Sequence, residues 1–335
     1  MRASVRVLVT GATGLIGRAL TRRLVALGLE VVALVRSQAA AVQAQGLGAR
    51  PRRADIGERA ILHGVAEGAE VVFHCAAQIS TAPEAVFRRL NVESVLWLLD
   101  EAVRSGVRRF VFVSSVAVYG PQEPPPGSDG LSEATPLRAR SAYGRSKVWA
   151  EQILQAAQAA GRIETVALRP CIVYGEGDRH FLPRVRAALH LPVLPVPDGG
   201  RRLVDLVHAD DVAAALWLAA TVPHAAGRAY NITSGERHTL AEILHTIARA
   251  LGRRPVLLPL PLRPLLPAAR PVLAAAYRVA QAVCPAYADV VDPRLLDSAL
   301  VNQHFAIARA RAELGYTPRI TLARGLQDLL ERKQG

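Results

Sequence analysis

Lysine is almost missing from this chain. Only two lysines, Lys147 and Lys333, occur among its 41 basic residues, so arginine supplies nearly all of the positive charge. Aromatic residues are also scarce, at 5%, which removes the stacking surface that single-stranded nucleic acids need. The arginines are scattered rather than clustered, so the net charge of +13 does not indicate a nucleic-acid partner. A positive field of this kind favours small anionic ligands instead.

Cysteines and long uncharged runs are lacking as well. Cys75, Cys171 and Cys284 stand far apart without metal-ligand spacing, so we expect no metal site and a reducing compartment. Arginines and prolines interrupt the apolar stretch 255–283, which leaves no run of about 20 uncharged residues for a transmembrane helix. The chain enters an apolar strand at once, so we expect no signal peptide and a cytoplasmic protein.

Apolar residues are abundant, at 51%, and their pattern predicts an α/β protein. Short β-branched runs alternate with amphipathic helical patterns up to Pro170, which is typical of a doubly wound parallel sheet, the Rossmann fold. Prolines become frequent after this point. We predict a dinucleotide-binding domain at 1–170, to which 203–232 returns, with the element 203–220 joining the main sheet. The remaining segments, 171–202 and 233–335, form a smaller, partly discontinuous substrate-binding region.

The segment TGATGLIG at 10–17 follows the first strand directly and opens a helical pattern. Gly11 permits a tight turn, Gly14 lets the backbone approach a pyrophosphate, and Gly17 allows close packing of the helix on the strand. The helix N-terminus adds amide donors and a positive dipole for phosphates. We therefore predict that a dinucleotide contacts Gly11, Thr13, Gly14, Leu15, Ile16 and Gly17.

The end of the second strand bears on the choice of dinucleotide. An NAD site usually has an acidic residue here, which holds the ribose 2′-hydroxyl, but this chain has Val35 followed by Arg36. A guanidinium suits a 2′-phosphate, so we favour NADP over NAD. Asp55 and Ile56 end the third strand, where they can meet the adenine; a helix cap is the alternative role for Asp55.

Tyr143 and Lys147 lie four residues apart and share one face of a predicted helix at 142–160. An ammonium beside a phenol lowers the phenol's pKa, so that the phenol can exchange a proton with a substrate oxygen. Lysine's compact charge also suits the ribose hydroxyls of a nicotinamide nucleotide, which explains a lysine at this one position. Ser115, at the end of the fifth strand, is the predicted partner for the substrate oxygen, with Ser114 as the competing candidate.

These motifs together resemble the extended short-chain dehydrogenase/reductase superfamily. The matching segments TGATGLIG, FVFVSSVAVYG, SAYGRSK and LRPCIVYGEGD follow one another in the family's order. The resemblance implies a catalytic tetrad of Asn91, Ser115, Tyr143 and Lys147, in which Asn91 holds a water in a proton relay to Lys147. It also implies further cofactor contacts, made by Ala76, Ala77, Pro170, Ile172 and Val173.

The resemblance implies an oxidoreductase that transfers a hydride between nicotinamide and a carbonyl or secondary alcohol. LVDLVHADDVAAALWLAA is similar to the 3β-hydroxysteroid dehydrogenase-like branch, which predicts a sterol-like or β-keto/β-hydroxy substrate under an apolar lid at 255–283. The alternatives are an epimerase of nucleotide-linked sugars with tightly bound NAD, and a cofactor-binding sensor without turnover. Arg179, Arg184, Arg201 and Arg202 could hold the pyrophosphate of such a sugar. The resemblance also implies a homodimer, through the helices at 87–105 and 142–160.

Overall fold

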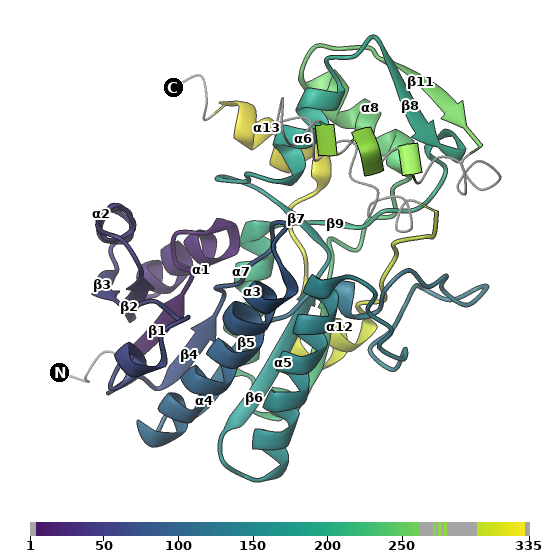
Figure 1. Cartoon of the computed structure of the whole chain (residues 1–335). Coiled ribbons are helices and arrows are strands. Elements are labelled where there is room, and N and C mark those ends of the chain that lie inside the picture. Colours follow the sequence, from purple (N-terminus) through teal and green to yellow (C-terminus); the bar gives the residue numbers. More distant parts are fainter. Residues whose placement is uncertain (1–4, 262–270, 273, 277, 280–299, 332–335) are drawn as a thin grey trace.

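The computed structural model describes residues 5–261, 271–272, 274–276, 278–279 and 300–331. Its centre is a seven-stranded sheet in the order β10-β6-β5-β4-β1-β2-β3, in which every pair of neighbours is parallel (Figure 1). The strands are β1 (Arg6–Thr10), β2 (Glu30–Val35), β3 (Arg50–Arg53), β4 (Val71–His74), β5 (Arg109–Val113), β6 (Glu164–Pro170) and β10 (Ala229–Ile232). This arrangement confirms the predicted doubly wound α/β fold.

Helices cover both faces of the sheet and form two separate cores. The helices α1 (Leu15–Ala26) and α7 (Ala209–Thr221) pack on one face, and α4 (Ser94–Arg104) and α5 (Ala142–Ala159) pack on the other. Because the central strands are buried on both sides, their sequences read as continuous apolar runs instead of alternating ones. Two shorter helices accompany them, α2 (Gln38–Gly46) and α3 (Glu84–Arg88).

A smaller region lies beyond the carboxyl ends of the strands (Figure 1). It contains two parallel strand pairs, β7 (Ile172–Tyr174) with β9 (Leu206–His208) and β8 (Val193–Pro197) with β11 (Val256–Leu260). Its helices are α6 (Phe181–Ala188), α8 (Leu240–Ala250) and α13 (Leu322–Glu331), whereas α12 (Ala308–Leu314) packs against β10 of the main sheet. Apolar residues of β8, α8 and α13 form a third core between these elements.

The prediction that the element 203–220 joins the main sheet was wrong for its strand. Residues 206–208 pair with β7 outside the sheet, and only the helix α7 packs back on it. The strand that does join is β10, which pairs with β6 at the edge of the sheet. A three-residue strand carries too little apolar pattern to specify its partner, so its position depends on tertiary packing.

The helix expected at 87–105 begins earlier and changes its winding. It comprises α3, a π-helical turn at Arg89–Glu93 and α4 in continuous succession. The π turn contains Asn91. No helix among the described residues is long and apolar enough to cross a membrane. Much of the predicted lid at 255–283, namely 262–270, 273, 277 and 280–283, lies outside the described residues, as do Cys284 and Lys333.

Candidate active site

The glycine turn joins β1 to α1 at the carboxyl edge of the sheet. Gly11 has a φ of 66°, and a side chain there would collide with the backbone of Ala76 after β4. A side chain at Gly17 would overlap the Gly11 carbonyl oxygen, so the helix can approach the turn only with glycine here. Gly14 begins α1 in an extended conformation, and no side chain caps the helix. Its first amides therefore suit a phosphate group, as the three predicted glycine roles require.

The other predicted residues of this edge surround the turn. Leu15 and Ile16 pack partly against the α1 core, and Thr13, Ala76 and Ala77 are half-buried. The Ala76 amide donates to Thr10 Oγ1 at 3.2 Å, which fixes the backbone beside Gly11. A Cβ at Gly11 would strike the backbone of Cys75 and Ala76, and a Cβ at Gly17 would strike that of Gly11, so the turn keeps its shape only with glycine at both positions. The uncapped amides at the start of α1 are the groups that could hold a dinucleotide phosphate, and the contacts of the surrounding residues with it stay a prediction.

Arg36 and Asp55 stand at the carboxyl ends of β2 and β3. Arg36 is exposed and makes no ion pair with a carboxylate of the described residues. The next residue, Ser37, caps α2 by accepting from the Ala40 amide at 3.2 Å. Asp55 Oδ1 accepts from the Gly57 amide at 2.8 Å, so this carboxylate closes its own turn. It does not cap the short helix that follows, whose N-cap residue is Glu58, and its contact with adenine stays a prediction. Ile56 is half-buried and packs against the core on the α4 side.

Tyr143 and Ser115 meet as the spacing predicts. Ser115 follows β5, and its Oγ accepts from the Ala117 amide at 3.2 Å. The same hydroxyl lies near enough to the Tyr143 phenol, on the first turn of α5, to lower the phenol's pKa. Ser114 is different, because its hydroxyl is buried and donates to Glu151 Oε1 at 2.5 Å. The geometry therefore favours Ser115 as the hydroxyl that can reach a substrate oxygen. Burial raises the pKa of Tyr143 to about 12, with the Ser115 hydroxyl acting in the opposite direction.

The expectation that Lys147 makes this phenol acidic was wrong for the structure in hand. Lys147 is 2% exposed, and Nζ donates to the Val113 carbonyl at 2.7 Å. Nζ lies 4.5 Å from the centroid of the Phe112 ring but 5.8 Å from that of Tyr143. Burial lowers the pKa of Lys147 to about 7, which weakens the charge that was expected to act on the phenol. The spacing of the two residues on one helix face thus predicted that Tyr143 and Lys147 are neighbours, but it did not predict how deeply each side chain is buried.

Asn91 is fully engaged with the protein. Its Oδ1 accepts from the Gln78 amide at 2.7 Å, and its Nδ2 donates to the Gln78 carbonyl at 2.9 Å and to Ser146 Oγ at 3.0 Å. The π turn directs this side chain between α5 and the segment after β4. Asn91 therefore ties the predicted cofactor wall at Ala76 and Ala77 to the helix that carries Tyr143. Its water-relay role stays a prediction.

A buried polar network that the sequence analysis missed lies beneath the tetrad. Glu151, one turn after Lys147, accepts from Ser114 and forms a two-point ion pair with Arg169, whose Nε and Nη2 donate at 3.0 and 2.6 Å. Arg169 Nη1 donates to the Tyr119 hydroxyl at 2.8 Å, and that hydroxyl donates to Asn231 Oδ1 at 2.7 Å. The network joins α5 to β6 and β10, so it holds the catalytic helix against the sheet.

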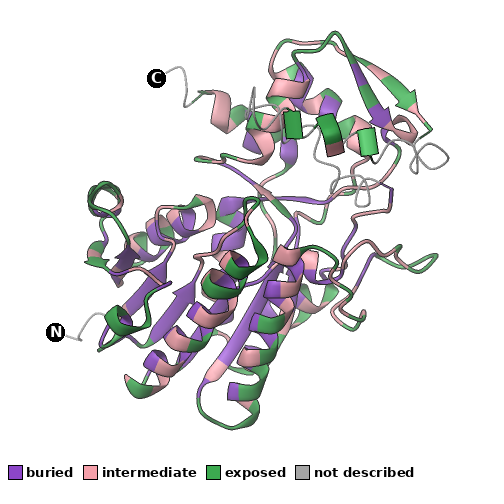
Figure 2. Ribbon diagram, in the orientation of Figure 1, coloured by how far each residue is buried: buried purple, intermediate pink, exposed green. Residues whose placement is uncertain are grey.

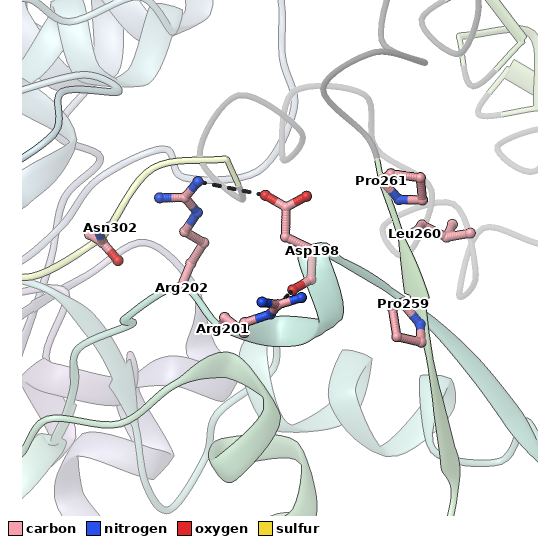
Figure 3. A pocket seen from close by; sticks show the side chains of 7 residues that line it. All are labelled: Asp198, Arg201, Arg202, Pro259, Leu260, Pro261 and Asn302. Carbon is pink, nitrogen blue, oxygen red and sulfur yellow. Dashed lines mark hydrogen bonds and ion pairs between the residues drawn. The ribbon is translucent and has the colours of Figure 1, made fainter.

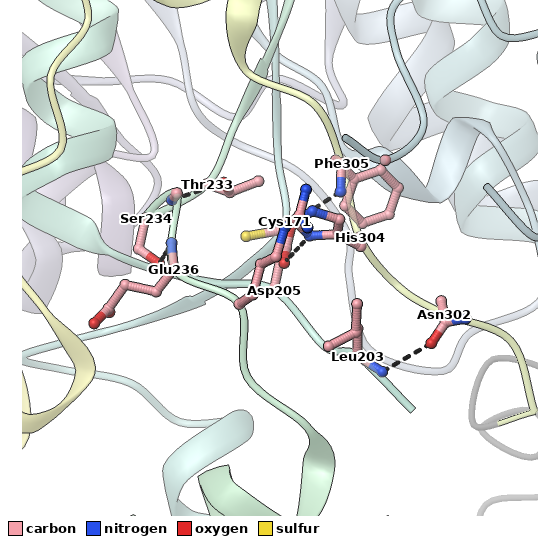
Figure 4. Close-up of polar contacts among 12 residues, drawn as sticks. Cys171, Leu203, Asp205, Thr233, Ser234, Glu236, Asn302, His304 and Phe305 are labelled. Carbon is pink, nitrogen blue, oxygen red and sulfur yellow. Dashed lines mark hydrogen bonds and ion pairs between the residues drawn. The ribbon is translucent and has the colours of Figure 1, made fainter. Parts of the chain in front are cut away.

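The substrate side begins at Pro170, where β6 ends. Ile172 is 37% exposed and Val173 half-buried, so both are available to a ligand above the sheet edge. Figure 4 shows the polar contacts behind this wall, around Cys171. Asp205, which precedes β9, is bonded to His304 Nδ1 at 2.7 Å, and its second oxygen accepts from the Phe305 amide at 2.8 Å. Burial raises the pKa of Asp205, and its bonds to His304 and Phe305 oppose that rise.

An open pocket of about 490 Å³ lies in the substrate region, lined by Asp198, Arg201, Arg202, Asn302 and 259–261 (Figure 3). Arg202 contacts Glu123 Oε1 at 3.2 Å and Asp198 Oδ2 at 3.6 Å, so its charge is already balanced by carboxylates. Arg201 is exposed, and among the described residues its side chain bonds only the Asp198 carbonyl, through Nε at 3.2 Å. Of the four arginines considered for a pyrophosphate, only these two line the pocket, and Arg202 is engaged elsewhere.

Comparisons with known proteins agree with this geometry. A family model described as the NAD dependent epimerase/dehydratase family matches residues 7–233. The chain is 33% identical to a 4-hydroxy-2-methyl-3-oxo-4-farnesyl-3,4-dihydroquinoline-1-oxide ketoreductase of Stigmatella aurantiaca, covering 97% of this chain and 95% of that protein. It is 29% identical to a 2-alkyl-3-oxoalkanoate reductase of Shewanella oneidensis, with coverage of 96% and 84%.

A solved structure shows the same fold. A short-chain dehydrogenase/reductase superfamily protein from Agrobacterium tumefaciens, crystallised with bound NAD, superposes with a TM-score of 0.75 at 25% identity. The match covers 98% of this chain and 97% of that one. The chain therefore belongs to the NAD-dependent epimerase/dehydratase family of extended short-chain dehydrogenases/reductases.

Proposed function

We propose that this protein is a ketoreductase, which reduces the carbonyl of an apolar substrate to a secondary alcohol with a nicotinamide nucleotide as hydride donor. The observation that carries the proposal is the position of Tyr143 and Ser115, which come close to each other where β5 ends and α5 begins. Two relatives named for ketone reduction support the direction, and both match nearly the whole chain.

The protein's own residues would supply the proton and the alignment. The Ser115 hydroxyl donates to the substrate carbonyl oxygen and holds it beside the Tyr143 phenol. Because the pKa of Tyr143 is about 12, the phenol keeps its proton at neutral pH and can deliver it to the oxygen as charge develops there. Lys147 lies below, within reach of a nucleotide ribose, and Asn91 keeps the cofactor wall and α5 in register. A bound nicotinamide supplies the hydride.

The raised pKa of Tyr143 favours reduction over oxidation. Reduction needs a protonated acid, whereas oxidation of an alcohol needs a phenolate, which is scarce when the phenol's pKa is about 12. We therefore expect the reductive direction to dominate near neutral pH. We also propose NADP over NAD, because the guanidinium of Arg36 is exposed at the end of β2 and lacks a carboxylate partner among the described residues.

The substrate class that we propose is a long-chain β-keto compound. Two related enzymes carry names with farnesyl or alkyl chains and an oxo group, and the residues that follow β6, Ile172 and Val173, are apolar and not fully buried. The narrower assignment to the 3β-hydroxysteroid dehydrogenase-like branch stays a prediction. A panel of 2-alkyl-3-oxoalkanoates, β-ketoesters and 3-ketosteroids, assayed by loss of NADPH absorbance, would rank these classes.

The decisive variant is Tyr143→Phe, which removes only the hydroxyl. We expect NADPH to bind with unchanged affinity in a fluorescence titration, while kcat falls by about 10²- to 10⁴-fold. The matched control is Tyr230→Phe, which removes a β10 tyrosine hydroxyl outside the tetrad that donates to Glu313 Oε2 at 2.9 Å, with wild-type turnover expected. Turnover of Tyr143→Phe within twofold of wild type would refute the assignment of Tyr143 as the acid.

An epimerase of nucleotide-linked sugars is the second candidate, favoured by the exposed Arg201 in the pocket of the substrate region. An epimerase regenerates its own cofactor, so it should purify with bound NAD and consume no external NADPH. A ketoreductase should instead oxidise NADPH in proportion to the ketone added. Absorbance of the purified protein at the nicotinamide wavelength, followed by the ketone assay, separates the two functions.

We also propose that two copies associate through α4 and α5. These neighbouring helices leave Leu96 and Trp149 exposed, at 40% and 39%, although both side chains are large and apolar. Burial of such residues against a second copy would give a four-helix contact. Light scattering of the wild type and of Leu96→Asp tests this, with a dimer expected for the first and a monomer for the second.

A further inference from the structure

The outer strand pair of the substrate region exposes an apolar sheet face. In this pair, Val193 of β8 lies opposite Val256 of β11. Leu194 and Val196 point into the third core, so the alternate residues of β8 point away from it. Val193 is 44% exposed, Val256 62% and Leu258 47%. A sheet that packs on a core with one face normally presents polar side chains on the other, and this pair does not.

Leu191, just before β8, extends the same surface and is 46% exposed. Figure 2 shows exposed residues along β11 at the end of the molecule farthest from the main sheet. We call Leu191, Val193, Val256 and Leu258 the outer apolar face. Side chains gathered in this way mark an interaction surface more often than scattered single ones do.

The two stretches that carry this face contain arginine but no carboxylate, and Asp198, the residue after β8, is paired with Arg202. Neither 179–197 nor 243–288 has an aspartate or glutamate, although the chain has 28 of them, and the two stretches hold three and six arginines. Arg186, Arg253 and Arg254 make no ion pair with a carboxylate of the described residues. Arg253 Nη1 donates to the Leu189 carbonyl at 3.2 Å, which places its charge where β8 and β11 both begin.

We propose that the outer apolar face docks on an anionic lipid bilayer. Val193, Val256 and Leu258 would enter the boundary between headgroups and acyl chains, and the arginines beside them would contact lipid phosphates. An anionic membrane surface matches both features of this face, because its acyl chains accept the apolar side chains and its phosphates pair with the arginines. A second copy of this chain fits less well, because a twofold contact through this face would bring the same arginines against each other.

Docking would bring the substrate region to the place where an apolar ketone dissolves. This benefit rests on the proposed function, whereas the binding itself follows from the face and its charge alone. The described part of the chain has no membrane-spanning helix, so the contact would be peripheral and reversible. Because headgroup attraction is electrostatic, it would weaken as salt is added.

The experiment is co-sedimentation of the full chain with vesicles. One set contains phosphatidylcholine alone, and the other contains phosphatidylcholine mixed with phosphatidylglycerol. We expect binding to the mixed vesicles, at least tenfold weaker binding to phosphatidylcholine, and a further loss in high salt. Val256→Asp/Leu258→Asp should lower the affinity for mixed vesicles at least tenfold, and Arg253→Glu/Arg254→Glu, next to the start of β11, should do the same.

The matched control is Val5→Asp/Leu27→Asp, which changes two side chains that are 39% and 51% exposed beside the main sheet. It should bind mixed vesicles like the wild type. Equal binding by Val256→Asp/Leu258→Asp and wild type would overturn the proposal, as would failure of the wild type to bind either vesicle. A wild-type oligomer that Val256→Asp/Leu258→Asp converts to monomers would assign the face to a second copy and overturn it as well.

Catalysis is measured separately. NADPH oxidation with a short, water-soluble β-ketoester should be the same in the wild type and Arg253→Glu/Arg254→Glu, two residues that precede the predicted lid at 255–283, and thermal unfolding should show both proteins to be folded. If vesicle binding is lost while this activity persists, the docking surface is supported whatever the natural substrate is. If vesicles bind but no ketone is reduced, the proposed function fails and the docking surface stands.

Discussion

The two regions of the molecule treat polar side chains in opposite ways. The nucleotide-binding domain buries charged groups such as Arg109, Glu151 and Arg169, each less than 5% exposed and each bonded to the protein. The third core, in the substrate region, is built from apolar residues, while its arginines Arg186 and Arg254 lie near the surface. Buried polar contacts demand one geometry, whereas apolar packing tolerates several, so the first region is suited to hold chemistry and the second to adapt to a ligand.

The largest effect that tests this contrast should come from Glu151→Gln. The substitution leaves the Arg169 guanidinium buried without its charge partner, which costs about 3–5 kcal/mol of unfolding free energy. The control in the substrate region is Glu242→Gln, whose side chain closes an exposed capping box on α8 and should change stability little. Urea unfolding of both variants measures the difference. Equal losses would show that the two regions do not differ in this respect.

Gly17→Ala should come next. The added methyl group would overlap the Gly11 carbonyl oxygen, so the glycine turn must move. The amides at the start of α1, which would bind a phosphate, then lose their alignment. We expect NADPH affinity to fall at least tenfold in a fluorescence titration. Gly46→Ala, at a helix position where a methyl group meets nothing within 4 Å, should bind NADPH normally and gain about 0.5–1 kcal/mol of stability. If Gly17→Ala bound NADPH as tightly as the wild type, the glycine turn would not be part of the cofactor site.

The buried lysine should leave a signature in the pH dependence of stability. The pKa of Lys147 is about 7 in the folded chain and near 10.5 when unfolded, so between these values the unfolded state binds more protons. Stability should therefore rise with pH from about 7 toward 10, by at most about 1.4 kcal/mol per unit, and the full cost of the buried charge is present below pH 7. Lys147→Met should flatten this rise.

Two titratable neighbours must be separated from the lysine. The pKa of His74 is about 3 in the folded chain and 6.5 when unfolded, so its contribution lies below pH 7. The pKa of Cys75 is about 12 in the folded chain and 9.0 when unfolded, so it lowers stability above about pH 9 in both variants, and the difference between their curves removes it. Thermal unfolding of the wild type and Lys147→Met across this range isolates the lysine. Parallel curves would mean that Lys147 keeps an ordinary pKa in the folded chain, and that the domain tolerates its charge.

The smallest effect should come from Arg36→Asp. Loss of a charge-assisted contact to the 2′-phosphate should reduce the preference for NADPH over NADH by about tenfold. Steady-state kinetics with both cofactors measures the ratio, and Arg23→Asp, a basic residue on the last turn of α1, serves as the control. An unchanged ratio in Arg36→Asp would show that this arginine does not read the cofactor.

The sequence predicted those parts that local patterns specify. The apolar runs and the glycine turn at 10–17 placed the strands of the main sheet within a few residues, because a buried parallel strand needs a continuous apolar run. The meeting of Tyr143 and Ser115 also followed from helix spacing and strand order. By contrast, β9 was assigned to the wrong sheet, since three residues cannot specify their partner.

Long-range polar pairing was invisible in the sequence. Glu151 and Arg169 look like two of many surface charges, and only their positions hint otherwise, four residues after Lys147 and inside a buried strand. The direction of the Tyr143 pKa was missed for a related reason. Desolvation depends on how deep a side chain lies, and residue spacing does not report depth.

The route of the chain has a mechanical consequence. It leaves the sheet after β6 to build β7, α6, β8 and β9, returns with α7 and β10, leaves again for α8, comes back as α12 and ends as α13 beyond the edge. The smaller region is therefore joined to the main sheet by several chain segments and not by a single linker. A protease that cuts one of these connecting segments should leave the two fragments associated. Any closing motion of the smaller region over a ligand must bend all of the connecting segments at once.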